Sequence, residues 1–277
     1  MVSDIDARGG RELDFSLTWP WNGDDLSSCG DGSMPETSLH RDLKRLYGDD
    51  QHAARHEVHW GDFRIDVVTA DELVEIQLGS LAAIRDKVAR LLKSHRVRVV
   101  KPIVIQKQLI TCPARGSAVT GRRRSPKRRT IWELFHELVY FVCVFPHPRL
   151  TLEVPLIEIE ERRHPGHGRR RRWRARDYQV EDQKLLAVRG VHRFQTAADL
   201  AALAPDGLPA PFHSGDLAAA LAIDRFVAQR VAYCLLHCGA ARHVGKKGNA
   251  RLYELSARDS RQPVRSEMGL TSEGVSG

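Results

Sequence analysis

The chain has 277 residues, 42% of them hydrophobic, which is enough for one large or two modest domains with a buried core. Its formal net charge of +8 predicts a polyanionic partner, with nucleic acid ahead of an anionic membrane surface. No apolar run approaches the roughly 20 residues that span a bilayer, and a polar first segment and five scattered cysteines favour a cytoplasmic protein with free thiols.

The first part of the chain predicts a tail and then a helix. Residues 1–32 are rich in Gly, Asp and Ser, and we expect them to be flexible. Residues 33–47 carry apolar side chains at helical spacing. Ser33 and Glu36 have the spacing of a capping box, but Glu36 also falls on the apolar stripe of this helix. Two roles therefore stay open for Glu36, which can cap the helix or point over a sheet toward a metal ion.

Two hairpins are expected next. Residues 56–60 alternate as a strand and are followed by a Gly-Asp turn. Glu57 on this strand is either a solvated charge or a further member of an acidic cluster. Apolar runs over 65–68 and 73–78 predict the two strands of a second hairpin.

Acidic side chains lie on this second hairpin. If its strands pair around the turn between them, Asp66 lies beside Glu75, and the period of two places Gln77 on the same face as Glu75. Two carboxylates on adjacent strands are a plausible cradle for a divalent cation. We therefore take Asp66 and Glu75 as candidate metal ligands, with Glu36 as a further candidate.

A helix and a parallel strand complete this first domain. Ser80 predicts the start of a helix that carries Lys87 on the border of its apolar face. The β-forming run over 96–105, interrupted by Pro102, predicts a strand parallel to the preceding one, with the helix as the crossover. The order helix, strand, hairpin, helix, strand indicates a small α/β sheet domain.

Two arginine-rich tracts occupy the middle of the chain. The first lies in a predicted loop over 113–130 and the second in a predicted basic linker over 161–190. Between them, 132–145 predicts an apolar helix and 150–160 predicts one or two strands. Charge runs are usually solvated, but arginines with an aromatic residue among them also suit contacts to phosphates and bases. The candidate nucleic-acid contacts are Arg122, Arg123, Arg124, Lys127, Arg128, Arg129, Arg170, Arg171 and Trp173.

The C-terminal region predicts a separate unit. Residues 191–256 read as three helices followed by a β-hairpin with a Gly-Lys-Lys-Gly-Asn tip, which is the order of elements in a winged helix. The longest helix would be the recognition helix, and the tip would contact phosphates. The same unit can instead pack on the sheet domain as a protein-interaction module. The candidate contact residues are Arg225, Gln229, Arg230, Lys246 and Lys247, and residues 257–277 predict a disordered tail.

Residues 33–110 resemble the restriction-endonuclease-like superfamily, the PD-(D/E)XK nucleases. In that superfamily an acidic residue on one strand is followed on the next strand by Glu-x-Lys, and a core helix often supplies another Glu. The matching residues here are Asp66, then Glu75-Ile76-Gln77, with Glu36 on the helix. The resemblance implies an α/β (α+β) fold over 33–160, with a mixed sheet flanked by helices, and Mg²⁺ or Mn²⁺ as the cofactor. The whole chain is also similar to a bacterial family with this two-part arrangement.

The departure from the superfamily pattern is Gln77, which stands where Lys is expected. A glutamine can hydrogen-bond a water or a phosphate oxygen but carries no positive charge. The superfamily also shows migration of this lysine to the following helix, where Lys87 is the natural candidate, with Lys101 as the second. The implied catalytic set is therefore Asp66, Glu75, Gln77 and Lys87.

The resemblance implies a metal-dependent nuclease that hydrolyses DNA phosphodiester bonds, with the winged helix as an accessory module. The alternative is a catalytically inactive nuclease fold that binds DNA as a regulator or scaffold, and the third option is a purely structural protein. Two buried carboxylates without a cation would be costly, which favours metal binding. We expect DNA as the partner, with RNA as a second option, and no membrane. A homodimer is an option because cutting both strands often needs two active sites.

Overall fold

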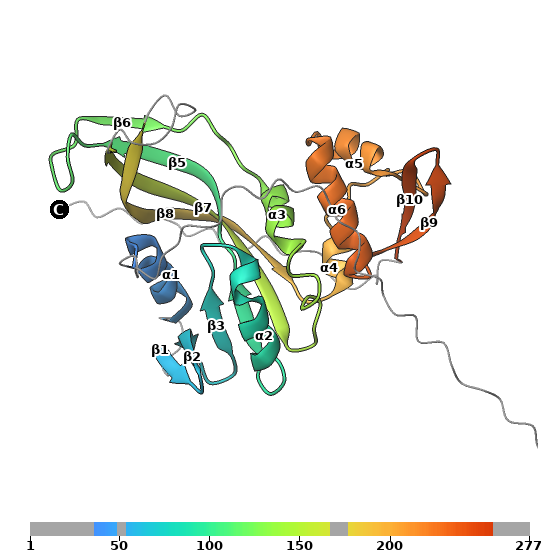
Figure 1. Cartoon of the computed structure of the whole chain (residues 1–277), viewed down its shortest axis with the longest axis horizontal. Coiled ribbons are helices and arrows are strands. Elements are labelled where there is room, and N and C mark those ends of the chain that lie inside the picture. Colours follow the sequence, from blue (N-terminus) through green and yellow to red (C-terminus); the bar gives the residue numbers. More distant parts are fainter. Residues whose placement is uncertain (1–35, 49–53, 167–176, 257–277) are drawn as a thin grey trace, which may run out of the picture. The chain divides into compact units, whose positions relative to one another are not determined.

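The structure is a computed structural model, and it describes residues 36–48, 54–166 and 177–256, which all lie in one compact unit that begins at Glu36. The described chain is a mixed α/β protein with an eight-stranded sheet flanked by helices and a second, two-stranded sheet (Figure 1). The predicted tails over 1–32 and 257–277 lie outside the described residues.

The elements follow in chain order, with η marking a 3-10 helix. They are α1 (Ser38–Gly48), β1 (Arg55–Trp60), β2 (Phe63–Val68), β3 (Leu73–Ile76), η1 (Leu81–Ile84), α2 (Arg85–Leu91), β4 (Val97–Val100), β5 (Ile103–Thr111), β6 (Gly121–Arg124), η2 (Ile131–Leu134), α3 (Phe135–Leu138), β7 (Leu150–Pro165), β8 (Tyr178–Phe194), α4 (Ala197–Ala201), α5 (Ser214–Leu221), α6 (Arg225–His237), β9 (Ala241–Lys247) and β10 (Ala250–Leu255).

The first three strands form an antiparallel meander, as the two predicted hairpins require. Trp60 pairs with Phe63 across a two-residue turn, in which Gly61 adopts a φ of 59° that glycine reaches without steric cost. β3 then runs parallel to β4, with η1 and α2 as the crossover. Ser80 caps η1 by accepting a hydrogen bond from the Ala82 amide. The predicted crossover and its start are therefore confirmed.

β4 and β5 are successive segments that both pair in parallel with β7. Pro102 lies between these two segments. Proline has no backbone N–H to donate to a neighbouring strand, so it commonly marks a break in a strand or an edge of a sheet. β5 continues to Thr111, well past the end of the strand predicted over 96–105.

Three predictions about the middle of the chain need correction. The predicted loop over 113–130 contains β6, which pairs with β5, and β7 and β8 cover most of the predicted linker over 161–190. Of the charges that suggested a linker, Arg162 is among the described residues and pairs across the β7–β8 ladder with Glu181. The predicted helix over 132–145 is shorter, because the helical segments end at Leu138 and turns follow.

The sheet is covered on both faces, which explains why neighbouring residues of β3 are all buried. Val74 and Ile76 belong to an apolar cluster with Leu39 and Leu43 of α1. Leu73 belongs to the cluster on the opposite face, which includes residues of α2 and α3. Alternation along the strand thus sends successive side chains into two cores.

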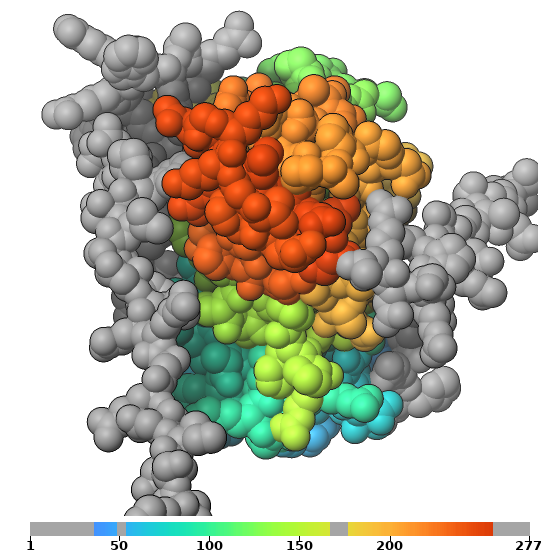
Figure 2. Space-filling model, turned by 90° about the vertical axis from the view of Figure 1, so that its right-hand side faces the viewer, coloured from blue at the N-terminus to red at the C-terminus, as the bar shows by residue number. Residues whose placement is uncertain are grey.

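The C-terminal helices share the larger of these cores. Apolar residues of α4, α5 and α6 belong to the same cluster as α2 and the sheet, and α6 contacts both η2 and α3. Figure 2 shows the C-terminal segments, in orange and red, directly against the green segment that contains α3. The boundary predicted at residue 191 therefore does not separate two cores. At the start of α5 the capping residue is His213, one residue before the predicted Ser214.

Candidate functional site

Asp66 and Glu75 lie side by side where β2 and β3 diverge. The register pairs Val67 with Val74, so the next step along the ladder sets Asp66 opposite Glu75. Pairing stops there, because the Ile76 amide donates to Asp66 Oδ2 at 2.9 Å rather than to a backbone carbonyl of β2. The Asp66 carboxylate is thereby held between the two strands. Asp66 lies beside Glu75, as expected if the strands of this hairpin pair around their turn.

Glu75 is bound on one side only. Lys87 Nζ, from α2, donates to Glu75 Oε1 at 2.7 Å and to the Arg64 carbonyl at 2.6 Å. Glu75 Oε2 is buried and has no hydrogen-bond partner among the described residues. Burial raises the pKa of Glu75, and the negative charge of Asp66 adds to the rise, against the opposing effect of Lys87. A cation beside the free oxygen would remove this cost.

Asp66 is held by groups of α1. Its Oδ2 lies 3.4 Å from His40 Nε2, and its Oδ1 lies 3.3 Å from Lys44 Nζ. Burial raises the pKa of Asp66, but the contacts with His40, the Ile76 amide and Lys44 outweigh burial, so its pKa lies below the ordinary value. Asp66 is therefore ionised at neutral pH.

Lys44 is the centre of a cluster of three carboxylates. Its ammonium lies 2.8 Å from Glu36 Oε1, 2.8 Å from Glu57 Oε1 and 3.3 Å from Asp66 Oδ1. The Lys44 side chain is only 9% exposed. Burial lowers the pKa of Lys44, but its hydrogen bonds to Glu36 and Glu57 and the charge of Asp66 outweigh burial and raise the pKa. The ammonium therefore keeps its charge.

The sequence suggested that Glu36 lies on the apolar stripe of α1, but in the structure it does not. The helix begins at Ser38, so Glu36 precedes it, and Thr37 accepts a hydrogen bond from the His40 amide. Ser33, the other half of the predicted capping box, lies outside the described residues. The carboxylate of Glu36 pairs with Lys44 instead.

The two strand carboxylates are compensated by protein charges. Asp66 faces Lys44 and His40, and Glu75 faces Lys87. Both carboxylates therefore have charge partners even without a metal, contrary to the expectation from the sequence. Within the described ranges, no three or more His, Cys, Asp or Glu side chains form a group that could hold a metal ion.

Lys87, rather than Gln77, stands next to these carboxylates. The amide of Gln77 donates to the Ser80 carbonyl at 2.5 Å. Lys101 donates to the carbonyls of Leu78 and Gly79, and burial lowers its pKa. Of the two lysines that the sequence offered, Lys87 is the one that contacts Glu75.

Sequence reasoning missed His40 and Lys44. Both are polar residues of α1, outside the apolar stripe that predicts this helix. Their signal is the spacing, because Glu36, His40 and Lys44 are four residues apart and such residues share one side of a helix. A glutamate, a histidine and a lysine at this spacing predict a line of ion pairs beside the sheet.

The basic residues predicted to bind nucleic acid have varied surroundings. Arg122, Arg123 and Arg124 are exposed on β6, and Arg122 lies 4.0 Å from Glu160. Exposed positions in the following segment are Lys127, Arg128 and Arg129. The residues of the second tract, Arg170, Arg171 and Trp173, lie outside the described part of the chain.

The C-terminal candidates divide into exposed and packed residues. Arg225 is exposed and Gln229 is half-buried, whereas Arg230 Nη1 lies 2.5 Å from His136 Nδ1 of α3. This contact holds that side of α6 against α3. Lys246 and Lys247 are exposed at the end of β9.

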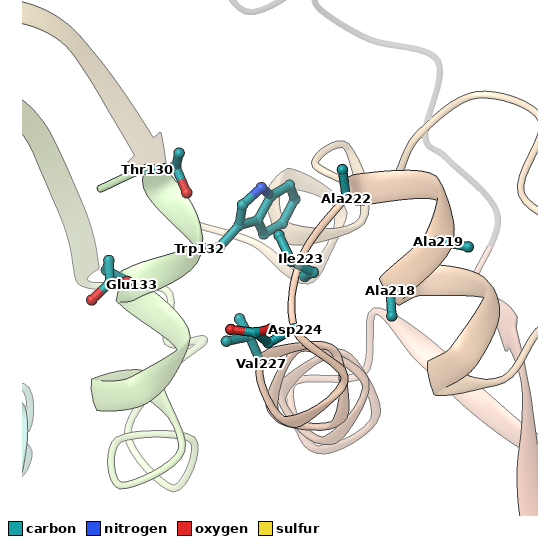
Figure 3. Close-up of a pocket in the computed structure, with 9 residues that line it drawn as sticks. All are labelled: Thr130, Trp132, Glu133, Ala218, Ala219, Ala222, Ile223, Asp224 and Val227. Carbon is teal, nitrogen blue, oxygen red and sulfur yellow. The ribbon is translucent and has the colours of Figure 1, made fainter. Parts of the chain in front are cut away.

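A hollow of about 480 Å³ lies between η2 and the α5–α6 junction. Figure 3 shows the Trp132 indole on one side and Ala222 and Ile223 on the other. Glu133 and Asp224 also line the hollow. None of the residues that line it belongs to the Asp66–Glu75 pair, so this hollow is separate from the candidate site.

These observations define a mixed α/β protein with a carboxylate pair held between diverging strands and neutralised by lysines. Residues 37–195, more than half of the chain, match the model of a domain of unknown function, DUF8091, so the chain belongs to this family. No curated protein and no solved structure matches the chain. None of the helices in the described ranges is long and apolar enough to cross a membrane.

Proposed function

We propose that this protein is a metal-dependent nuclease that hydrolyses DNA phosphodiester bonds at the Asp66–Glu75 pair. One observation carries the proposal. Glu75 is buried beside a second carboxylate, and its Oε2 has no partner in the described structure. An unpaired buried carboxylate oxygen is costly and is typical of a site that receives a cation or a substrate.

The order of elements supports the proposal. A helix, a three-stranded antiparallel meander, a crossover and a parallel fourth strand follow each other in α1 to β4. This order is in keeping with the resemblance to the PD-(D/E)XK superfamily, in which an acidic residue on one strand is followed by Glu on the next strand. Asp66 on β2 and Glu75 on β3 would take these two places.

Two carboxylates suit Mg²⁺ or Mn²⁺ in a nuclease site. Mg²⁺ keeps several waters and is commonly bound by one or two carboxylates together with substrate phosphates. Asp66 and Glu75 would hold the ion, and the free Oε2 of Glu75 is the fitting donor. When bound, the cation would supply an activated water and would neutralise charge on the phosphate.

Lys87 would do the work of the lysine that the Glu-x-Gln sequence lacks. Its ammonium is fixed between Glu75 and the Arg64 carbonyl, so it approaches the site from α2 with little freedom. An ammonium in this position would orient the attacking water or steady the negative charge that develops on the phosphate. Gln77 would have an indirect role, because its side-chain amide binds the Ser80 carbonyl in the turn after β3.

Exposed basic groups would hold the polyanion. The arginines of β6 and the lysines at the end of β9 are candidates for phosphate contacts. We further propose that α4 to β10 form a winged helix, because three helices followed by a β-ribbon are its order of elements. The contact of Arg230 with His136 favours docking of α6 on the sheet region.

A second candidate function is a catalytically inactive DNA-binding scaffold. It is favoured by the compensation of both carboxylates, because Lys44 and Lys87 make the pair stable without a metal. Titration of the purified protein with Mn²⁺ separates the two functions. Absence of binding at millimolar metal would favour the scaffold.

Cleavage assays test the nuclease directly. We expect Mg²⁺-dependent cleavage of plasmid, single-stranded or branched DNA, and a loss of at least about 100-fold in Asp66→Asn and in Glu75→Gln. Asp71→Asn is the matched control, because Asp71 is an exposed carboxylate on the turn of the same hairpin. Cleavage that survives both site substitutions would refute this site.

A further inference from the structure

One side of α6 carries aromatic side chains that are exposed. Phe226 is 46% exposed and Tyr233 is 43% exposed. Intervals of four, three and four residues place four side chains on this side of the helix: Phe226, Arg230, Tyr233 and His237. Phe226 is also the one exposed phenylalanine in the described part of the chain. We call this side, defined by these four residues, the aromatic face of α6.

The side chains of the aromatic face contact one another. The guanidinium carbon of Arg230 lies 4.4 Å from the centre of the Phe226 ring, and the centres of the Tyr233 and His237 rings are 4.1 Å apart. Arg230 also contacts His136 of α3. These contacts restrict the rotamers of the exposed side chains, which lowers the entropic cost of ordering them when a ligand binds.

The surroundings of the aromatic face are positively charged. After its N-cap residue Asp224, α6 contains no Asp or Glu. Burial lowers the pKa of His237, and the charge of the exposed Arg251 on β10 lowers it further, so the His237 ring is neutral at pH 7. Exposed rings with arginines beside them suit unpaired bases and the phosphates between them, because every base has a face that can stack on a ring.

We propose that the aromatic face of α6 binds single-stranded nucleic acid by stacking unpaired bases on Phe226, Tyr233 and His237. The formal net charge of +8 favours a polyanion over a second copy of this chain, which would repel the first. The inference goes beyond the proposed function, because stacking on α6 needs neither a metal ion nor cleavage at the Asp66–Glu75 pair. It also adds residues to α6 that the predicted contacts with duplex DNA do not include.

Fluorescence anisotropy of a labelled single strand of about 16 nucleotides tests this inference on the full chain, in EDTA so that no metal-dependent cleavage occurs. We expect the single strand to bind at least about 10-fold more tightly than a duplex of the same sequence, whose bases are already stacked. DNA and RNA strands of one sequence form two arms, and tight binding of either supports the inference.

Variants of the aromatic face locate the binding. Phe226→Ala and Tyr233→Ala should each weaken single-strand binding by about 10-fold, whereas Tyr233→Phe, which keeps the ring, should stay within about 2-fold. Duplex binding should not change, which separates lost stacking from lost folding. Tyr178→Ala is the matched control, because Tyr178 lies on β8 and is 41% exposed.

Three outcomes overturn the inference. Equal affinity for single strand and duplex does so without any variant, and so does an equal loss of affinity in Tyr178→Ala and Tyr233→Ala. The third is self-association in analytical ultracentrifugation that Tyr233→Ala abolishes while oligonucleotide binding is unchanged, because the face then belongs to a second copy of the chain.

The result is independent of the cleavage assays. Single-strand binding that depends on Phe226 and Tyr233, in a chain that cleaves no DNA, supports this inference and overturns the proposed nuclease. Cleavage that depends on Asp66 and Glu75, with single-strand binding unaffected in Phe226→Ala and Tyr233→Ala, leaves the nuclease standing and overturns this inference.

Discussion

At the level of single residues, Glu161 on β7 is buried, as are Glu75 and Glu153. It is 1% exposed and accepts hydrogen bonds from Lys107, Arg163 and Gln183. Burial raises the pKa of Glu161, but the hydrogen bond and charge of Lys107, together with the other two donors, outweigh burial and lower it. Glu161 is therefore a charge that stabilises the folded state.

We expect the stability contributed by Glu161 to depend on pH. Its folded pKa is lower than its unfolded value, so its contribution is complete above about pH 4.3 and is lost as the pH falls through the folded pKa. Glu161→Gln should lower the free energy of unfolding by about 2 kcal/mol at pH 7. The deficit should shrink at about pH 3, where the unmodified carboxyl approaches protonation.

Urea denaturation at the two pH values measures this difference. Glu160→Gln is the control, because Glu160 is half-buried and lies 4.0 Å from Arg122, and we expect it to change stability by less than about 0.5 kcal/mol. If Glu161→Gln shows the same deficit at both pH values, the charge of Glu161 is not what stabilises β7.

The residues of the candidate site were predictable to different degrees. The position of Asp66 beside Glu75 could be predicted from the alternation of the strands and the length of the turn between them. These two features fix the hairpin register, and the register fixes which residues lie opposite each other. His40 and Lys44 could not be assigned in this way, since their role depends on how α1 lies over the sheet. The choice of Lys87 over Gln77 and Lys101 likewise depends on side-chain contacts that no local pattern contains.

At the level of elements, α1 is fixed to the sheet by one apolar side. Leu43 is fully buried in the cluster with β2 and β3, whereas Leu46, on the same helix, is 42% exposed. Leu43→Ala should therefore lower the free energy of unfolding by about 3 kcal/mol. Leu46→Ala, the matched control, should cost less than about 1 kcal/mol.

Thermal or urea unfolding of both leucine variants checks this difference. Because α1 also carries His40 and Lys44, a loosened helix should weaken the contacts of both with Asp66. Equal losses in the two variants would mean that α1 is not held by the side that contains Leu43.

The N-terminal elements were predictable because each is specified locally. The strands β1 to β4 have short turns, a β-forming composition and a capped crossover. The first part of β7 was predicted as a strand over 150–160, but its end and most of β8 were not, since the charged residues over 161–190 read as a linker until the partner strand is known. Pairs such as Arg189 with Glu158 and Arg193 with Glu153 exist only across the hairpin.

At the level of the whole molecule, the sheet and the C-terminal helices are one unit with a shared core. Charges at distant points of the chain can therefore act together on one polyanion. The formal net charge of +8 favours such a partner, and the exposed lysines of β9 are among the groups that can meet phosphates.

The salt dependence of DNA binding tests whether the tip of the β9–β10 ribbon contacts the backbone. If Lys246 and Lys247 each neutralise one phosphate of a duplex, Lys246→Gln/Lys247→Gln should reduce the slope of log K against log salt by roughly 2. Gel-shift titrations over a series of salt concentrations give this slope. The matched control is Lys93→Gln/Lys184→Gln, which removes two positive charges from exposed positions elsewhere. Equal changes of slope in the two double variants would mean that binding follows net charge alone, because a ribbon that contacts phosphates must contribute more than the same charge placed away from the DNA.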